Sequence, residues 1–581
     1  MRLLWFLLSV LVAPHSAVGA TVGKERRSSL NEVSATILTP DFVETVQKII
    51  DEGGVPGLTL AVVNKTGPAE LGAWGIKSEN GTNMTTDTLF SIASCSKAFL
   101  SASLGIVIDD FANGRNTTPL PVGLSTLTWK TKLKGQPDRY PYTSIWCRKV
   151  KFLCRLLRAL TALITVIALS NDFSSKKNDS TSDIARNLRN FRPTFELREQ
   201  YLYNSQMYMV GAYVVSTLTG IRLADFVNYR IFKPLGMNSS TYSIDEALQT
   251  GKFTDTWTSF GRLIPPWIQE EYVDLIAGSG GVISSQAPWI RMVLNGGVDP
   301  VSNVTIIPSA GFEVITGAHS IVSPNVSAEI STALYGLGWG RVSYLGHDII
   351  SHDGGAPGVS TVIIAALEDG VGIIVLANAD SEGNPISDII LAVTEKAFGS
   401  ANSSSPLPLT NQSDVLRRSN LPRHDGVMAR ADDDGTAVPS DVDLLTGIYY
   451  NAGYGTGQLC SVRSSSPTCG SVLDAFRSID PTLSSNSSSN DLFVSWDTVY
   501  STHIRFTYTN DSQYLIYVGS IYAEGYGKNS TPFSTLAPGA RAEFVVENES
   551  VVGFGWNDIS DGVKREGSVE ETSDVWFVKQ E

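Results

Sequence analysis

Residues 90–99 read FSIASCSKAF, and within them Ser94 stands three positions before Lys97. The apolar run FSIAS precedes the serine and the stretch KAFLSASLGIVIDD follows it, which predicts a strand leading into a helix. Backbone N–H groups at a helix start favour negative charge, and a residue three places on lies on the same face. If Lys97 is buried, its amine loses affinity for a proton and can act as a general base toward the serine hydroxyl.

The spacing alone does not establish a reactive centre. A serine at the start of a helix often does no more than cap it. The chain also holds a second Ser-x-x-Lys match, from Ser174 to Lys177, in a polar stretch that contains an N-glycosylation sequon. Other motifs are therefore needed to separate the two matches.

Two such motifs follow along the chain. In YNSQMYMVG, Tyr203 directly precedes the predicted helix 207–220, which Gly220 closes. In SHDGGAPG, His352 is predicted to end a strand, and residues 353–355 are predicted to turn the chain. A second His-Asp-Gly at residues 424–426 has no strand pattern around it and is interpreted as a coincidence.

Taken together, these motifs resemble the β-lactamase-like serine hydrolases, which include class C β-lactamases, penicillin-binding proteins, D-aminopeptidases and related esterases. The resemblance covers roughly residues 40–400 and implies no metal and no cofactor. It also implies a small ester, an amide or a D-amino acid peptide as substrate. The catalytic residues that it implies are Ser94, Lys97, Tyr203 and His352, and the oxyanion and substrate-binding positions are Ser94, Gly355, Ser205 and Gly354.

The resemblance implies a mechanism through an acyl-enzyme on Ser94, with Lys97 or Tyr203 as the base; the sequence leaves open which of them acts. His352 would take the place of a cation on the strand, and it titrates near neutrality. The family usually has asparagine where this chain has Ser205. Because serine reaches less far, this departure favours esters slightly over β-lactams.

The pattern predicts an α+β fold: an antiparallel sheet flanked by helices, with an all-helical subregion, as in β-lactamases and transpeptidases. Strands are predicted at 57–64 and 69–77 and as a meander over 337–379, with helices at 40–54 and 385–398. Strands at both ends of this segment should complete one sheet.

The stretch WCRKVKFLCRLLRALTALITVIALS, residues 146–170, does not fit this pattern. It is basic and then apolar, and it stands where relatives usually carry a His-x-Ser-Gly-Leu-Pro segment. Its apolar part is too short to span a bilayer. Three interpretations remain: a buried helix, a helix at a membrane interface, or a mis-spliced or frame-shifted translation that would impair folding or activity.

The chain begins with an arginine, an apolar run and small residues, which predicts a secretory signal peptide over residues 1–20; an uncleaved anchor is the alternative. A formal net charge of −14 argues against nucleic acid and against stable membrane association. We therefore expect a secreted, extracellular, fungal-type glycoprotein with N-linked glycans; its oligomeric state is not predicted. Fourteen sequons begin at Asn64, Asn80, Asn83, Asn116, Asn178, Asn238, Asn303, Asn325, Asn402, Asn411, Asn486, Asn510, Asn529 and Asn548.

After the hydrolase domain, placed at 21–400, residues 401–440 read as a flexible linker, and 441–581 as a separate β-barrel that resembles the lipocalin-like domains of some D-aminopeptidase relatives. We expect Cys460 and Cys469 to pair, and Cys95 to be buried and free; a Cys147–Cys154 pair is a weaker possibility. The aromatic residues of the barrel are expected to fill its core. They are Tyr449, Tyr450, Tyr454, Trp496, Trp556 and Trp576.

Three functions are consistent with these patterns. The leading hypothesis is a secreted serine hydrolase of a small ester or amide. The alternative is a secreted binding protein that keeps the fold but has lost turnover, for which Ser205 and the stretch 146–170 argue. A membrane-tethered protein is the third, and it rests on the two apolar stretches.

Overall fold

The computed structural model describes residues 36–122, 124–131, 174–192, 201–285, 287–323, 332–380, 385–399, 441–484, 489–510, 513–557 and 566–581. The predicted signal peptide, the stretch 146–170, the cysteines at 147 and 154, and the linker lie outside these ranges. Residues 37–581 form one compact unit.

The hydrolase segment is built on one eight-stranded antiparallel sheet in the order β2-β1-β12-β11-β10-β9-β8-β7. Its strands are β1 Gly57–Asn64, β2 Glu70–Gly75, β7 Ser320–Ser323, β8 Ala333–Tyr335, β9 Gly340–Tyr344, β10 His347–Ala356, β11 Val359–Ala366 and β12 Val371–Ala377. Because β1 pairs with β12, strands from both ends of the segment complete the sheet, as predicted.

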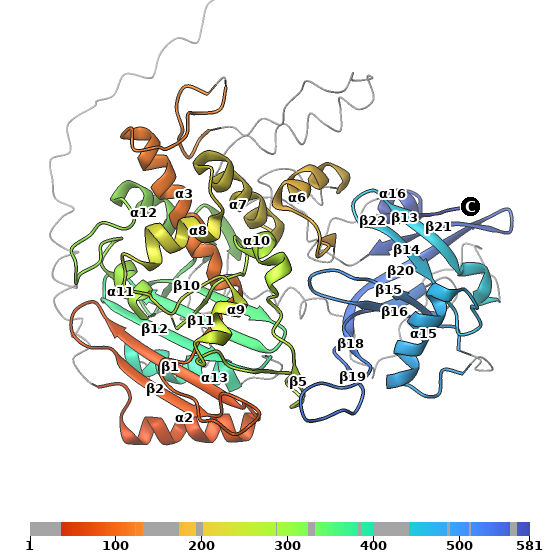
Figure 1. The fold of residues 1–581 in the computed structure, drawn as a ribbon, viewed down its shortest axis with the longest axis horizontal. Helices are drawn as coiled ribbons and strands as arrows, with labels where there is room; N and C mark the ends of the chain where they lie inside the picture. The colour runs from red at the N-terminus through yellow and green to blue at the C-terminus, as the bar shows by residue number, and fades with distance from the viewer. Residues whose placement is uncertain are drawn as a thin grey trace, which may run out of the picture. The chain divides into compact units, whose positions relative to one another are not determined.

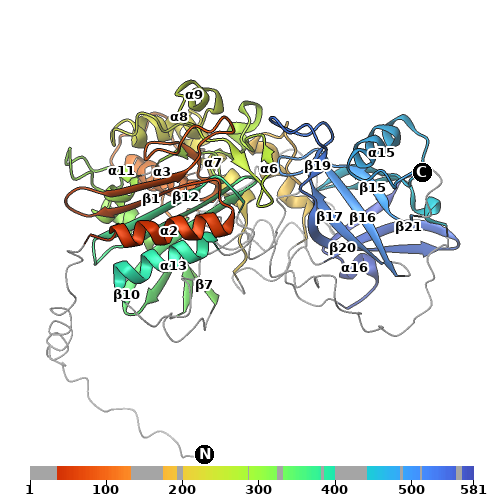
Figure 2. The same ribbon diagram turned by 90° about the horizontal axis from the view of Figure 1, so that it is seen from below.

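Helices cover both faces of this sheet (Figures 1 and 2). The first and last helices, α2 Pro40–Gly53 and α13 Pro385–Phe398, pack together on one face. The opposite face carries the helical subregion, in which α11 packs on β1, β11 and β12. Its helices are α3 Lys97–Ala112, α6 Thr181–Asn187, α7 Ser205–Thr219, α8 Leu223–Val227, α9 Ile244–Gln249, α10 Val273–Ile276, α11 Ala287–Leu294 and α12 Ser309–Thr316, with the short helices η1 Ala93–Ser96, η3 Leu188–Asn190, η4 Asn228–Phe232 and η5 Glu270–Tyr272.

The local sequence explains these elements. Phe42, Val46 and Ile50 recur every four residues along α2 and are buried, and Gly54, at a φ of 65°, ends the helix in the left-handed region. Strands β11 and β12 are buried along their whole length because helices cover both faces, which explains their near-continuous apolar runs. The predicted α+β fold is confirmed.

The C-terminal segment forms a second eight-stranded antiparallel sheet in the order β14-β13-β22-β21-β20-β17-β16-β15. A bridge between Cys460 and Phe493 joins its two edges, so the barrel is nearly closed. Its strands are β13 Gly447–Asn451, β14 Gly455–Leu459, β15 Leu492–Ser495, β16 His503–Asn510, β17 Gln513–Gly519, β20 Ala537–Glu547, β21 Ser550–Asn557 and β22 Val575–Lys579. Smaller elements of the whole chain are β3 Phe90–Ser91, β4 Thr256–Trp257, β5 Leu263–Ile264, β6 Ile283–Ser284, β18 Ile521–Tyr522, β19 Phe533–Ser534, η6 Val442–Leu445 and α16 Val569–Thr572.

The barrel differs from its prediction in one element. Residues Pro467–Ile479 form a helix, α15, which the strand pattern did not indicate. Ser466 caps it through the N–H of Cys469, and proline stands at its first position, so the start signals of a helix were present in the sequence. The expected disulfide between Cys460 and Cys469 is confirmed, and it ties this helix to the end of β14.

Most aromatic residues of the barrel lie in its core, as expected. Tyr449, Tyr454, Trp496 and Trp556 are buried and contact one another or neighbouring phenylalanines. The expectation is wrong for Tyr450, which is 44% exposed, because it follows Tyr449 on the strand and so points to the opposite face of the sheet. Trp576 is only half-buried for the same reason, since it stands between the buried Val575 and Phe577 on β22.

Candidate active site

Ser94 and Lys97 are in direct contact in the interior of the hydrolase domain. Lys97 Nζ lies 2.9 Å from Ser94 Oγ and also donates to the Ser279 carbonyl at 2.8 Å. The lysine is fully buried, and Ser94 is buried except for a small exposed part. Lys97 is therefore removed from water, as its predicted role as a general base requires.

The serine does not lie in the first turn of α3. It lies in the preceding short helix, η1, and α3 begins at Lys97. Ala93, just before the serine, has a φ of 43°, in the left-handed region that costs a residue with a side chain about 1–2 kcal/mol. The predicted strand before it is only Phe90–Ser91, which pairs with β6. The strained turn fixes the direction in which the Ser94 hydroxyl projects.

Lys97 is held by backbone on two sides. The Ser279 carbonyl accepts one of its hydrogen bonds. Gly338, in the turn between β8 and β9, packs against the start of α3 so closely that a Cβ there would meet the Lys97 carbonyl carbon at 2.8 Å. The two aromatic rings of Tyr203 and Tyr208 lie 4.8 and 5.2 Å from Nζ. Their faces favour a positive charge, which the amine acquires when it accepts a proton.

Tyr203 lies beside this pair, directly before α7. Asn204 caps that helix by accepting from the Met207 N–H at 3.0 Å, and Ser205 is the first helical residue, buried. Burial raises the pKa of the Tyr203 phenol well above its ordinary value, and the nearby Ser94 hydroxyl opposes the effect. The two hydroxyls do not reach hydrogen-bond geometry, and Tyr203 has no hydrogen-bond partner among the described residues. The phenol is therefore protonated, not a phenolate.

His352 comes from β10, which is longer than predicted. The sequence places the end of a strand at His352 and a turn at 353–355, but β10 continues to Ala356 and the turn is Pro357–Gly358. That prediction was wrong because strand β11 supplies a partner for both glycines. The imidazole ring lies 6.1 Å from the Tyr203 ring, so His352 shares the site with the other three predicted catalytic groups.

The two glycines after it have different surroundings. A Cβ on Gly354 would meet the Ile92 carbonyl oxygen at 2.3 Å, so only glycine lets β10 approach η1. At Gly355 a Cβ would meet nothing within 4 Å, and this residue borders open space.

The register of β10 assigns a direction to the Gly355 N–H. Ala356 and Val359 flank a two-residue turn and form its closing hydrogen-bonded pair, so by alternation Gly355 is in a non-hydrogen-bonded pair. Its N–H therefore points away from β11, toward the side where β9 no longer pairs, because that pairing ends at Ser351. The arrangement leaves this N–H available to an oxyanion.

The electrostatics of His352 differ from the sequence expectation. Burial and the positive charge of Lys97 lower the pKa of His352 to about 3. The imidazole is therefore neutral across the physiological range and does not replace a strand cation.

Sequence reasoning assigned no role to several neighbours of this site. Tyr335 bonds to His352, and the Ser279 carbonyl accepts a hydrogen bond from Lys97. Cys95 is buried and free, as expected; its thiol lies 3.4 Å from the His352 carbonyl oxygen, and burial raises its pKa to about 12. The thiol is thus a link between η1 and β10 and not a nucleophile.

The other Ser-x-x-Lys match has a different environment. Ser174 Oγ accepts from Gln206 Nε2 at 2.7 Å, and Lys177 Nζ pairs with the Asp497 carboxylate at 2.7 Å. Each side chain thus has its own partner, and the two are structural.

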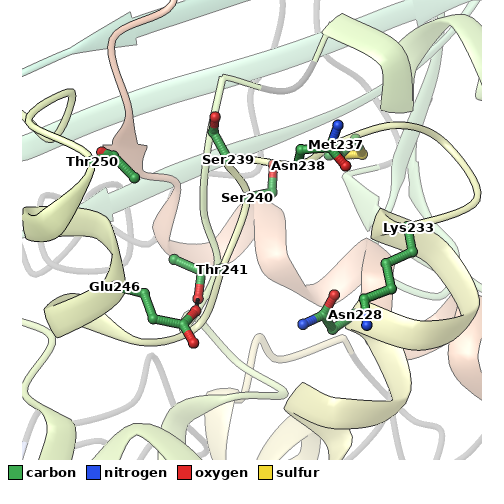
Figure 3. Close-up of a pocket in the computed structure, with 9 residues that line it drawn as sticks. All are labelled: Asn228, Lys233, Met237, Asn238, Ser239, Ser240, Thr241, Glu246 and Thr250. Carbon is green, nitrogen blue, oxygen red and sulfur yellow. Dashed lines mark hydrogen bonds between the residues drawn. The ribbon is translucent and has the colours of Figure 1, made fainter.

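A separate cavity of about 210 Å³ lies outside this site (Figure 3). It is lined by Asn228, Lys233, Met237, Asn238, Ser239, Ser240, Thr241, Glu246 and Thr250. Within the described ranges, no group of His, Cys, Asp and Glu residues could hold a metal ion. In the same ranges no single helix has the length and apolarity to cross a membrane; by these criteria alone, one bent pair, Ser205–Thr219 with Leu223–Phe232, could.

Known proteins share this arrangement of elements. The beta-lactamase family model matches residues 42–110 and 160–394, more than half of the chain. The chain belongs to the beta-lactamase family. The match omits 111–159, which includes the first part of the stretch that the sequence marked as atypical.

The chain is similar in sequence to two proteins that have been named. The unguisins hydrolase ungD' of Aspergillus campestris (strain IBT 28561) is 28% identical over 366 residues, which are 61% of this chain and 64% of that protein. Penicillin-binding protein 4* of Bacillus subtilis (strain 168) is 26% identical over 339 residues, 54% of this chain and 66% of that protein. The chain thus spans about two thirds of the length of each.

Solved structures of similar architecture include two of low identity. The octameric penicillin-binding protein homologue from Pyrococcus abyssi has a TM-score of 0.49 at 14% identity, covering 93% of this chain and 99% of that one. The D-amino acid amidase from Ochrobactrum anthropi SV3, complexed with L-phenylalanine amide, has a TM-score of 0.46 at 18% identity, covering 61% and 98%.

Proposed function

We propose that this chain is a secreted serine hydrolase that cleaves a small ester or amide through an acyl-enzyme on Ser94. The observation that carries the proposal is the buried contact of 2.9 Å between Ser94 Oγ and Lys97 Nζ, with Tyr203 and His352 beside it. The Lys97 amine is buried and donates to the Ser94 hydroxyl and the Ser279 carbonyl. A buried amine in contact with a serine hydroxyl is suited to accept the proton of that nucleophile.

In the resting site Lys97 carries the positive charge that acts on His352, and it must first release a proton to solvent. In the first step, Ser94 Oγ attacks the carbonyl carbon while the Lys97 amine takes the hydroxyl proton. A C–O bond forms, and the carbonyl oxygen becomes an oxyanion that the Ser94 and Gly355 N–H groups receive. The bond to the leaving group then breaks. Tyr203, whose phenol is protonated, donates its proton to that group and regains one from Lys97, which holds the proton taken from Ser94.

In the second step, water attacks the acyl-enzyme. Lys97 takes a proton from this water as its oxygen bonds to the acyl carbon, and then gives that proton to Ser94 Oγ as the C–O bond to serine breaks and the carboxylic acid leaves. Because burial keeps Tyr203 protonated, we assign the role of base to Lys97 and the role of proton donor to Tyr203. This assignment is our proposal for the alternative that the sequence left open.

The substrate class is inferred from the relatives and from the site. A relative named as a hydrolase of unguisins supports hydrolysis of an amide or ester, and D-amino acid peptides remain candidates. The wall beside the nucleophile is aromatic, formed by Tyr201, Tyr203 and Tyr335, and His352 adds no charge to it. This wall favours an uncharged acyl group over a carboxylate-bearing one.

Export is part of the proposal. The described sequon asparagines are all exposed except Asn64, which is half-buried; the exposed ones are Asn80, Asn83, Asn116, Asn178, Asn238, Asn303, Asn529 and Asn548. Exposure is what attachment of a glycan requires. When the full chain is expressed in a fungal host, it should appear in the medium and lose apparent mass on treatment with an N-glycosidase. A protein that stays in the cell pellet and keeps its apparent mass after this treatment would contradict the proposal.

The test of the reaction uses a fluorophosphonate probe on the full-length protein, followed by turnover of p-nitrophenyl esters, D-amino acid amides and a chromogenic cephalosporin. We expect covalent labelling of wild type, no labelling of Ser94→Ala, and unchanged labelling of the matched control Ser174→Ala. Turnover should be highest on the esters, because Ser205 replaces the usual asparagine.

The same experiment distinguishes the alternative. A folded wild-type protein that neither reacts with the probe nor turns over any substrate would support a binding protein that retains the fold. Labelling that survives Ser94→Ala would contradict the assigned nucleophile.

A further inference from the structure

A buried tyrosine that the proposed reaction does not use stands behind His352. Tyr335 ends β8 and is 1% exposed. Its hydroxyl lies 3.0 Å from His352 Nε2 and 3.1 Å from the Tyr208 hydroxyl. The three side chains thus form one chain of hydrogen bonds, from Tyr208 through Tyr335 to the imidazole.

The chemistry of the groups fixes the direction of each bond. His352 Nδ1 lies 2.5 Å from the Asp353 carbonyl oxygen, which can only accept, so Nδ1 carries a proton. The ring is neutral and has one proton, so Nε2 is an acceptor. The Tyr335 hydroxyl therefore donates to Nε2, and its oxygen is free to accept from Tyr208.

Both nitrogens of His352 are thus occupied by the protein. The ring has no nitrogen left for a substrate. Among the proposed reacting groups, the Tyr203 ring lies 6.1 Å from it, and Lys97 acts on it through its charge. The charged and titratable groups around it are Lys97 on α3, Tyr203 before α7 and Tyr335 on β8; on its own strand it meets the Asp353 carbonyl. A proton gained by this ring would place a second positive charge next to Lys97.

We propose that Tyr335 is a positioning residue that holds His352 in its uncharged form with the proton on Nδ1. By donating to Nε2, it blocks the position where a second proton would bind. Lys97 is then the group whose charge changes during the proposed reaction, and the aromatic wall beside Ser94 stays neutral. This inference rests on the proposed function for its consequence in catalysis, but not for the hydrogen-bond pattern itself.

The first experiment reads the tautomer directly and needs no turnover. In wild-type protein labelled with ¹⁵N-histidine, the ring resonances of His352, assigned by their loss in His352→Gln, should show a protonated Nδ1 and an unprotonated Nε2 at pH 5 to 7. A proton on Nε2, or a doubly protonated ring, would overturn the proposal even if the protein is an active hydrolase.

The second experiment compares Tyr335→Phe with Tyr208→Phe, each of which loses one hydroxyl and keeps its ring. Removing the Tyr335 hydroxyl takes away a bond made only to the neutral imidazole, so the pKa of His352 should rise by about one unit. The Tyr208→Phe variant leaves the hydrogen bond to His352 Nε2 in place, so it should shift the pKa of His352 less.

The readout is thermal unfolding from pH 4 to 7. When a histidine stays neutral in the folded state, the protein loses stability as the pH falls below about 6.5, which is the pKa of an unfolded histidine. The Tyr335→Phe variant should lose less thermal stability on acidification than wild type does. The amount by which its Tm lies below that of wild type should therefore be largest at pH 7 and shrink toward pH 4. A deficit that is constant with pH would mean that Tyr335 only packs.

If turnover is detected, the same variants separate the two proposals further. The acid limb of the kcat/KM profile should move to higher pH in Tyr335→Phe and not in Tyr208→Phe. A uniform fall in kcat with an unmoved profile would contradict the positioning role. Absence of turnover in wild type would refute the hydrolase and leave the tautomer result standing.

Discussion

The chain contains the same four-residue pattern twice, at Ser94–Lys97 and at Ser174–Lys177, and the two copies have different surroundings. In the first, the lysine is removed from water and contacts the Ser94 hydroxyl and the Ser279 carbonyl. In the second, the serine bonds to an amide and the lysine meets a carboxylate at the surface. Spacing is identical in both, so the surroundings, and not the motif, decide whether a serine can become a nucleophile.

The largest expected difference between the copies is in catalysis. Lys97→Met should lower kcat/KM on a p-nitrophenyl ester by about 10²–10⁴-fold, because it removes the base that takes the serine proton. Lys177→Met serves as the matched control and should stay within about twofold of wild type. Comparable losses in both variants would mean that the two lysines do not differ in function.

The pH dependence of stability also distinguishes Lys97 from Lys177. Burial and the charge of Lys97 hold the pKa of His352 at about 3, below the unfolded value near 6.5. The stability that this neutral ring contributes is present above pH 6.5 and is lost as the pH falls toward 3, with a ceiling of about 5 kcal/mol.

Removing the Lys97 charge should raise that pKa, although burial, the larger cause, remains. Denaturant unfolding from pH 7 to 4 should therefore show a smaller acid loss in Lys97→Met, by about 1 kcal/mol, and an unchanged loss in Lys177→Met. An equal acid loss in wild type and Lys97→Met would exclude the coupling between the amine and the imidazole.

The smallest effect is expected at the second serine. Ser174→Ala removes an acceptor of Gln206 Nε2, which keeps Ser175 Oγ at 3.1 Å, so the free energy of unfolding should fall by only about 1 kcal/mol. Activity should be retained. Chemical denaturation together with ester turnover checks this; a loss of activity at full stability would give Ser174 a role that we do not assign.

The sequence predicted features that depend on local pattern. The helix 385–398 was predicted with its correct ends, and the helix closed by Gly220, whose φ is 78°, with its correct C-terminal end, because capping glycines and apolar periodicity are local signals. The latter helix begins at Ser205, before its predicted start at 207. The sequence also grouped Ser94, Lys97, Tyr203 and His352 into one site, through the resemblance to a family. The structure brings these four together.

Features that depend on tertiary contact were missed. The extension of β10 through Gly354 and Gly355 could not be read from a Gly-Gly pair, which resembles a turn, because only the presence of β11 makes it a strand. The neutral state of His352 depends on burial beside Lys97, and the role inferred for Tyr335 depends on a contact over 17 residues. None of these leaves a mark in the spacing of residues.

The unequal room at the two neighbouring glycines has a consequence for reshaping the enzyme. Position 354 admits no side chain, since a methyl group there would collide with the Ile92 carbonyl oxygen, whereas position 355 faces open space. New specificity is therefore best introduced at 355, where alanine or serine would add a side chain without displacing the main chain. Libraries built at 354 would be expected to yield misfolded proteins in place of altered substrate ranges.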